Sequence, residues 1–523
     1  MANDSDREIE LDSKSLGQRG ITVAALTGSS RVLGLARDVV LSSFFGAGPI
    51  ADAFFVAFRI PNFFRRLLAE GAFSQAFIPV LSDYQEKRSR EELEEFVRTI
   101  AGNFGVVLTA ICVLGVLLAP VFVLLFTLGA WQGDDRHDLA SGLLRIMFPY
   151  LGLISFTAFL GAILNSFNRF AVPAFTPVLL NVALIAGALA GSHVFDQPVF
   201  ALAWAVIFAG VLQFAFHMPS LASLRLLRLP KFNWRSDGTR RVLKILGPAV
   251  YAASAGQINI LVGTILASQL VVGSVSWLYY ADRLIELPVG MIAIAIQTVI
   301  LPNLSKLHQR EDIGGYQASL AWGLHVGIYV GVPATAGLCC ISVPLIATLF
   351  FHGEFDSDAV FKVSYALQAF GIGVLPLMLV RILAPGYYAR HDTVTPFKYA
   401  SISVGINILV SLSLFKLIGH IGIALATSVA AFAQAVLLLK GLVARGDILI
   451  DKQLAKVVLQ SVIACAGMMI VLLILVPSNE FWLSTTIWVR IGWLGLLITS
   501  GMGAYFMILV LAGVRPRHFL GRL

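Results

Sequence analysis

The chain has 523 residues, of which 58% are hydrophobic and only 13% are charged, and its mean hydropathy is +0.83. Soluble domains carry about 25% charged residues, so this composition excludes an ordinary soluble protein and indicates a polytopic membrane protein. The formal net charge is +8, but the basic residues are spread over short segments with no aromatic-interleaved basic domain. That distribution argues against nucleic-acid binding.

The first 20 residues are predicted to form a cytoplasmic tail. Acidic residues such as Asp4 and Glu8 predominate there, so the segment lacks the positive start of a signal peptide. The four cysteines lie in apolar stretches without metal-ligand spacing. We therefore predict no disulfide framework and no metal site.

Apolar runs long enough to cross a bilayer follow this tail. A membrane-spanning helix needs about 20 apolar residues, and fourteen segments meet this length. They lie near 21–45, 52–82, 97–127, 140–166, 173–191, 197–219, 242–270, 277–305, 316–350, 360–388, 396–415, 418–438, 457–476 and 487–513. The predicted fold class is an all-α integral membrane protein with 14 transmembrane helices.

The loop charges predict the orientation of these helices. Nearly all loop Lys and Arg residues follow even-numbered spans, whereas loops after odd-numbered spans hold only Arg136 and Lys416. Cytoplasmic loops carry the excess of Lys and Arg in membrane proteins. Both termini and all loops after even-numbered spans are therefore predicted to be cytoplasmic.

Three local matches predict an internal duplication. The matched segments are 78–82 with 301–305, Pro120 with Pro344, and Arg169 with Arg390, at offsets of 221–224 residues. Spans one to six and seven to twelve are thus predicted to be two pseudo-symmetric six-helix lobes, followed by two C-terminal helices. Such parallel repeats commonly rock about a site between them. The predicted domains are a tail (1–20), an N-terminal lobe (21–219), a basic cytoplasmic linker (220–241), a C-terminal lobe (242–438), a cytoplasmic loop (439–456), the last two spans (457–513) and a C-terminal tail (514–523).

Twelve charged residues lie inside or at the edges of these spans, although a charge at the bilayer centre costs about 3 kcal/mol on insertion scales. They are Arg31, Arg37, Asp38, Asp52, Arg59, Arg65, Arg66, Glu70, Asp282, Arg283, Glu286 and Arg381. At 100° per residue, Asp52, Arg59, Arg66 and Glu70 fall within about 40° of one another, as one polar stripe along the second span.

Two interpretations of these charges stay open. In the structural one, acids and arginines pair to fasten helices together, which suits Arg37, Asp38, Asp282 and Glu70. In the other, cations bind a ligand, which suits Arg31, Arg65, Arg66, Arg283 and Arg381. Arginine binds phosphate oxygens bidentately and keeps its charge when desolvated. The excess of arginine therefore predicts a cationic interior that binds a phosphate-bearing anion.

Long motifs carry a family resemblance. They include Ser30-Arg-Val-Leu-Gly34, Ala51-Asp-Ala-Phe-Phe-Val-Ala-Phe58, Pro61-Asn-Phe-Phe-Arg-Arg66, Gly273-Ser-Val-Ser-Trp277 and Leu383-Ala-Pro-Gly-Tyr-Tyr388. Over its whole length the chain resembles the MurJ/MviN family of bacterial lipid II flippases, within the multidrug/oligosaccharidyl-lipid/polysaccharide exporter superfamily.

This resemblance implies a flippase for lipid II, the undecaprenyl-diphosphate-linked disaccharide-pentapeptide of cell-wall synthesis. Transport would run by alternating access from the cytoplasmic to the periplasmic leaflet of the bacterial inner membrane, with the last two spans forming a groove for the lipid tail. The expected substrate-binding residues are Arg31, Arg37, Asp52, Arg65, Arg66, Arg283 and Arg381, with Asp38, Arg59, Glu70, Asp282 and Glu286 as supporting charges. Asn407 and Thr427 are weak candidates for the sodium site of some members.

Other functions fit the sequence less well. An ion-coupled exporter of another polyprenyl-linked glycan or of a drug remains the alternative, although a drug antiporter would need an acidic cavity. An enzyme is not expected, because the acids Asp134, Asp135 and Asp138 lie in a loop, where solvated charges are the rule. No phosphate-binding G-x-x-x-x-G-K-[ST] run occurs. No cofactor is expected, and the energy source is left open between a monovalent cation and the membrane potential. The expected partners are lipid II and membrane lipid, and cell-wall synthesis machinery is left open as a further partner. A role as a scaffold for that machinery, without transport, is also left open.

Overall fold

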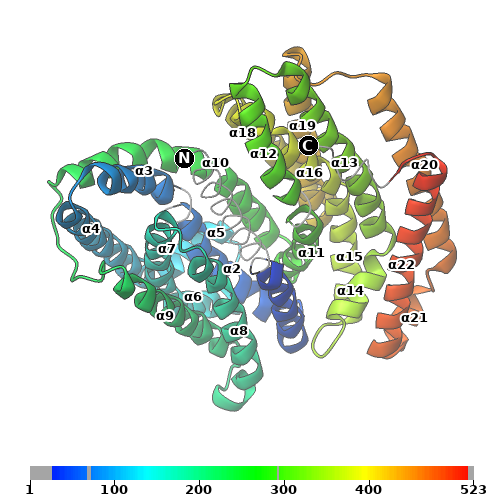
Figure 1. Cartoon of the computed structure of the whole chain (residues 1–523). Helices are drawn as coiled ribbons and strands as arrows, with labels where there is room; N and C mark the ends of the chain where they lie inside the picture. Colours follow the sequence, from blue (N-terminus) through cyan, green and yellow to red (C-terminus); the bar gives the residue numbers. More distant parts are fainter. Residues whose placement is uncertain (1–25, 27, 68–71, 291–293, 516–523) are drawn as a thin grey trace. The chain divides into compact units, whose positions relative to one another are not determined.

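The computed structural model describes residues 26, 28–67, 72–290 and 294–515, and within them it is helical without a strand (Figure 1). The first half comprises a helix at 28–45, then α2 (Pro49–Arg65), α3 (Ala72–Lys87), α4 (Arg90–Leu117), α5 (Ala119–Thr127), α6 (Asp135–Met147), α7 (Tyr150–Ser166), α8 (Ala171–Val194), α9 (Val199–Ser223) and α10 (Asp237–Ser268). The second half comprises α11 (Ser274–Pro288), α12 (Ile294–Gln309), α13 (Ile313–Cys340), α14 (Ser342–Phe350), α15 (Ser357–Gly371), α16 (Val374–Leu383), α17 (Pro385–Tyr388), α18 (Val394–Ile418), α19 (His420–Ala444), α20 (Lys452–Leu475), α21 (Asn479–Ser484) and α22 (Ile487–Leu511).

The all-helical membrane fold is confirmed. Ten helical stretches among the described residues are long and apolar enough to cross a membrane, and each overlaps one of the fourteen predicted spans. The four predicted spans without such a stretch are 21–45, 52–82, 242–270 and 277–305. The count of fourteen therefore stays a prediction, and the four spans in question include the three richest in charged residues.

Two of these four spans change from α-helical to π-helical geometry partway along. The predicted span 52–82 consists of α2 and α3, and the helix passes into a π turn at residues 66–67. The predicted span 277–305 consists of α11 and α12, with the same change at residues 289–290. π turns are rare in proteins, and those that occur are often found at functional sites. A single helical wheel for the second span is therefore wrong beyond α2, and Glu70 lies outside the described residues.

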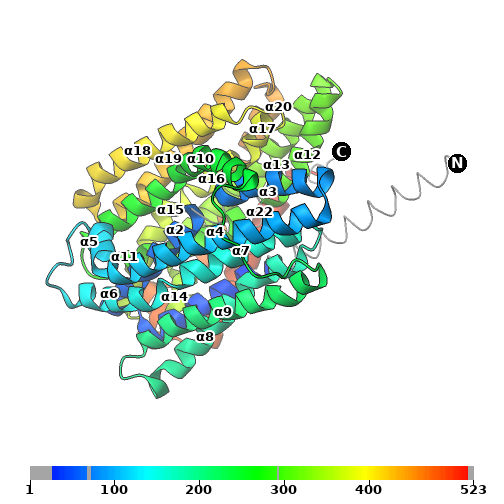
Figure 2. The same ribbon diagram turned by 90° about the vertical axis from the view of Figure 1, so that its left-hand side faces the viewer.

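The helices repeat as the local matches predict. α4 and α13 both have 28 residues and begin 223 positions apart, at Arg90 and Ile313. Each is followed at once by a nine-residue helix, α5 or α14. α8 packs along α9, and α18 packs along α19 in the same way (Figures 1 and 2). The two halves are thus built from the same series of helices.

The chain divides into two compact units. The first comprises the described residues up to Phe45 together with Pro49–Gln257, and the second comprises Gly46–Gly48 together with the described residues from Ile258 onward. The division falls inside α10. The predicted lobes at 21–219 and 242–438 and the other predicted domain boundaries remain predictions.

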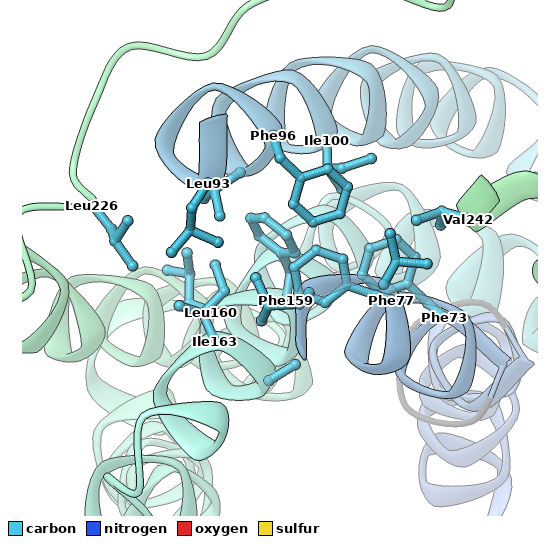
Figure 3. Close-up of a cluster of buried hydrophobic side chains, with 14 of the residues drawn as sticks. Phe73, Phe77, Leu93, Phe96, Ile100, Phe159, Leu160, Ile163, Leu226 and Val242 are labelled. Carbon is cyan, nitrogen blue, oxygen red and sulfur yellow. The ribbon is translucent and has the colours of Figure 1, made fainter. Parts of the chain in front are cut away.

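Aromatic rings form part of the core of the first unit (Figure 3). Phe73 stacks on Phe104 with ring centroids 4.3 Å apart, and the ring centroids of Phe77 and Phe159 are 5.0 Å apart. Each such pair contributes about 0.5–1.5 kcal/mol beyond the area that it buries. Because lipid tails are as apolar as the helices, close packing of this kind holds helices together in a membrane. The cluster joins α3 to α4 and α7.

The last two long helices pack on the second unit. α20 lies against α13, and α22 lies against both α20 and α14. Arg490 on α22 is buried, and its Nη1 donates to the carbonyls of Ala347 (3.2 Å) and Phe351 (3.1 Å). A cation at the C-terminal end of a helix is favoured by the helix dipole. Arg490 therefore fastens α22 to the end of α14.

Candidate functional site

The candidate residues fall in both units, and the first group lies on the helix at residues 28–45. Arg37 and Asp38 are 5% and 0% exposed. Nε and Nη2 of Arg37 donate to Oδ1 of Asp38 at 2.9 and 2.6 Å. Nη1 of Arg37 donates to Asn181 on α8 at 3.1 Å. A buried, hydrogen-bonded pair of this kind suits the structural interpretation for these two residues.

Arg31 lies on the same helix but is only partly buried. The amide of Asn181 donates to the carbonyl of Ser30 at 3.1 Å, so α8 also supports the backbone immediately before Arg31. The helix therefore presents one accessible arginine beside a tightly held one. The role of Arg31 in binding a ligand stays a prediction.

Asp52 on α2 is buried at 1% exposed, and the structure supplies a cation that sequence reasoning missed. Nη1 of Arg136 lies 3.9 Å from Oδ2 of Asp52. Arg136 also donates to Oδ2 of Asp134 at 2.8 and 2.6 Å, and its guanidinium lies 4.8 Å from the Trp131 ring. These contacts fasten α2 to the start of α6.

Asp134 departs from the interpretation of the acids at 134, 135 and 138 as solvated charges, whereas Asp135 and Asp138 are exposed as that interpretation predicts. Its side chain is paired with Arg136 and caps the N-terminus of α6. The hydrogen bond from Arg136 lowers the pKa of the Asp134 carboxyl against a smaller opposing effect of burial. The signal was present in the sequence, because Arg136 is one of only two basic residues expected in the loops after odd-numbered spans.

The remaining arginines of the second predicted span differ in exposure. Arg59 and Arg65 are partly buried, whereas Arg66 is exposed in the π turn. Nε of Arg65 donates to Oδ1 of Asn62 at 3.2 Å, which orients its guanidinium along α2. Among the candidate residues of the first unit, the partly or fully exposed arginines are thus Arg31, Arg59, Arg65 and Arg66.

In the second unit, the charges of α11 lie nearer the surface of the unit. Arg283 donates from Nη1 to Oε2 of Glu286 at 2.7 Å, and the two side chains are 29% and 47% exposed. Asp282 is exposed on the same helix. Arg381 is exposed near the end of α16. The expected contact of each with a substrate stays a prediction.

Two further candidates concern ions. Asn407 on α18 donates to Oγ1 of Thr427 on α19 at 3.2 Å, so these weak sodium candidates are joined to each other. In the part of the chain that the structure describes, no three His, Cys, Asp or Glu side chains form a metal-binding group. The four cysteines are free thiols.

Comparisons with known proteins place these features in a family. The family model for lipid II flippase MurJ matches residues 41–491. A probable lipid II flippase MurJ of Vibrio cholerae is 42% identical over 96% of this chain and 97% of its own length. A second relative with the same description, from Haemophilus influenzae, is 41% identical over 94% of this chain and 99% of its own length.

Solved structures agree with this placement. A lipid II flippase MurJ in an inward closed conformation superposes with a TM-score of 0.79 at 27% identity, over 93% of this chain and 98% of that one. An inward-facing multidrug transporter of the MATE family and the MOP superfamily superposes with a TM-score of 0.65 at 14% identity, over 81% of this chain and 98% of its own. The second likeness concerns the fold alone. The resemblance inferred from the motifs is confirmed, and this chain belongs to the MurJ family of lipid II flippases.

Proposed function

We propose that this protein is a lipid II flippase that carries its substrate from the cytoplasmic to the periplasmic leaflet of the bacterial inner membrane. The observation that carries the proposal is similarity along nearly the whole chain, at 42% identity, to a relative described as a probable lipid II flippase. The reaction is transport, and no covalent bond is made or broken.

The diphosphate of lipid II is the part of the substrate that arginine would recognise. Arg31, Arg65 and Arg66 in the first unit, and Arg283 and Arg381 in the second, combine a fixed positive charge with an accessible side chain. Charged hydrogen bonds to phosphate contribute about 1.5–3 kcal/mol each. Arg37 and Asp52 are buried against protein partners, so we assign them to positioning the helices.

Transport would proceed by alternating access of the cationic residues to either leaflet. An inside-negative potential favours outward movement of the anion by about 2.3 kcal/mol per charge per 100 mV. The same potential favours the return of the unloaded cationic residues to the cytoplasmic side. A monovalent cation remains a second candidate for coupling.

The polyprenyl tail requires an apolar surface. α20 and α22 expose apolar side chains such as Leu473 (67%) and Met507 (61%), which suits contact with lipid tails. The predicted tail groove at 457–513 falls on these two helices. The loop charges support an orientation with both termini in the cytoplasm, where cell-wall synthesis enzymes are candidate partners.

Leaflet-resolved translocation of lipid II in proteoliposomes tests the proposal. Arg31→Ala and Arg381→Ala should each slow translocation about tenfold to a hundredfold, from the energy of one charged hydrogen bond, at unchanged protein level and melting temperature. Arg88→Ala is the matched control, because Arg88 is exposed and pairs only weakly with Glu92 at 3.2 Å.

Two outcomes would contradict parts of the proposal. Wild-type rates in both arginine variants would remove these residues from the transport path. Failure of the wild type to move lipid II, with export of another polyprenyl-linked glycan or a drug in the same vesicles, would replace the substrate.

A further inference from the structure

A cavity of about 680 Å³ lies within the second unit, apart from the arginines discussed above. It is lined by the first half of α13, the residues before α20, the first turns of α20 and the residues after α22. These helices pack side by side, α13 against α20 and α20 against α22 (Figure 1). Sites for small ligands usually measure about 300–1,000 Å³, so the cavity has the size of a binding site.

Buried hydrogen bonds hold the back of this cavity. The hydroxyl of Tyr329 donates to Oε1 of Gln460 at 2.8 Å, and Nε2 of Gln460 donates to the carbonyl of Ala512 at 2.8 Å. One amide thus joins α13, α20 and the end of α22. Because donor and acceptor are both used, this wall is fixed before any ligand arrives.

The mouth of the cavity carries one charge of each sign. Asp451 and Lys456 both line it and are exposed. Gly314, in the first turn of α13, lines it too, so the N-termini of α13 and α20 meet there. Both N-termini are already capped by carboxylates: Asp312 accepts from the Gly315 N–H at 2.8 Å, and Asp451 accepts from the Leu454 N–H at 2.9 Å. Lys456 is therefore the group at this mouth that would bind a phosphate, whereas the Asp451 carboxylate would attract a cation.

The cavity also borders a lipid-facing surface. Further along α20, Leu459, Ile463 and Ile470 are 60%, 53% and 59% exposed, which is expected for a helix in contact with acyl chains. The Trp322 side chain lines the cavity, and tryptophan is enriched where the membrane meets water. An occupant would therefore have its polar end in the cavity and its apolar end along α20.

We propose that this cavity binds the headgroup of a zwitterionic phospholipid that carries a phosphodiester and a primary ammonium, as in phosphatidylethanolamine. The phosphate lies near Lys456, and the ammonium lies near Asp451. The acyl chains follow the exposed apolar face of α20. The bound lipid stabilises the packing of α20 on α13 and does not require the transport of lipid II.

Native mass spectrometry of the purified full-length chain tests this site. The protein is mixed in detergent with equal amounts of phosphatidylethanolamine, phosphatidylcholine and phosphatidylglycerol, and the retained lipid is identified. The wild type should retain phosphatidylethanolamine in preference to the others. Lys456→Ala should lower its occupancy about fivefold, the effect of one lysine near a phosphate surface.

Three variants separate the contributions. Asp451→Ser keeps a residue that can cap α20 but removes the carboxylate, so the preference over phosphatidylcholine should disappear. Ala321→Phe fills the cavity and should abolish retention. Lys452→Ala, a lysine of the same helix that does not line the cavity, should behave as the wild type, and all variants should keep the wild-type melting temperature in lipid-free detergent.

The proposal would be overturned by equal retention in the wild type and Ala321→Phe, since the lipid would then bind elsewhere. A preference for phosphatidylglycerol would also overturn it, because that lipid lacks the ammonium. If Ala321→Phe melts at a lower temperature, Lys456→Ala is compared with Lys452→Ala, since each removes one exposed lysine. Equal retention of phosphatidylethanolamine by these two variants would then overturn the proposal.

Discussion

Two ion pairs within predicted spans, one in each unit, are held differently. In the first unit, Arg37 and Asp38 are almost completely buried and are bonded to each other and to α8. In the second unit, Arg283 and Glu286 pair on a helix surface where both remain partly exposed. The helices α4 and α13 nevertheless have the same length, as do α5 and α14.

The comparison shows that helices can repeat between the two units while the environment of their ion pairs differs. A duplicated fold needs helices of matching length at corresponding places, and α4 with α13 and α5 with α14 are such helices. The buried pair of Arg37 and Asp38 satisfies its hydrogen bonds at one particular place, whereas Arg283 and Glu286 pair at a helix surface. Burial therefore distinguishes residues that fasten helices from residues that remain available to a ligand, and mutations can test the distinction.

The largest effect is expected for Asp38→Ala. Removing the carboxylate leaves a buried guanidinium without this partner, which costs about 3–5 kcal/mol when a buried pair is broken. The free energy of unfolding in mixed micelles should fall by that amount. The double variant Arg37→Met with Asp38→Ala should recover most of the loss, and a loss equal to that of the single variant would contradict the pair's structural role.

A smaller effect is expected for Asp52→Asn. Arg136 lies 3.9 Å from Asp52 but keeps its closer bonds to Asp134, so only part of its pairing is lost. We expect a loss of about 1–3 kcal/mol, the cost of leaving a buried group less well bonded. Asp135→Asn, in the first turn of α6, is the control. Equal melting temperatures for the two variants would show that the contact between Asp52 and Arg136 does not fasten α2.

Two acids in loops outside the spans, Asp392 and Asp447, allow the effect of burial to be tested through the pH dependence of stability. Burial alone would raise the pKa of Asp392, but hydrogen bonds from the Thr395 N–H and from Arg445 outweigh it and lower the pKa from 3.8 to about 2. The stability from a lowered carboxyl pKa is present above 3.8 and is lost as the pH falls toward 2. Asp392→Asn should therefore lower the melting temperature at pH 7, by the equivalent of about 1 kcal/mol for so exposed a pair, and the difference should shrink below pH 3.8.

Asp447 provides the opposite case in the same cluster. It is 2% exposed and paired with Arg390, yet burial raises its pKa above 3.8. The folded protein then holds a proton more tightly than the unfolded chain, so this carboxyl becomes less stabilising as the pH rises above 3.8. The cost of Asp447→Asn should decrease with rising pH, and a parallel pH profile for Asp392→Asn and Asp447→Asn would contradict both assignments.

The smallest effect is expected for Glu286→Gln. Ion pairs with exposed side chains contribute about 0–1 kcal/mol, so the melting temperature should stay within a few degrees of the wild type. The measurement is thermal unfolding in detergent with and without 0.5 M salt. A loss as large as that of Asp38→Ala would end the distinction between the two units.

The sequence predicted the membrane class, the duplication and the family with little ambiguity. Apolar length and loop charge act locally along the chain, so they can be recognised without knowing the fold. The sequence did not predict the π turns in the second and eighth spans, although Pro61 and Pro288 lie close to them. A proline weakens a helix at its own position, but packing decides whether the helix kinks or breaks there.

The sequence by itself determined that arginines and acids lie in apolar helices, because composition and periodicity place them there. Only the tertiary structure decided which of them pair. Arg136 lies 84 residues from Asp52 and 2 residues from Asp134, and no spacing rule connects the first two. Asn181, which bonds to Arg37, is 144 residues away. Contacts between helices depend on how the helices pack, and that packing results from many weak contacts acting together rather than from any local pattern.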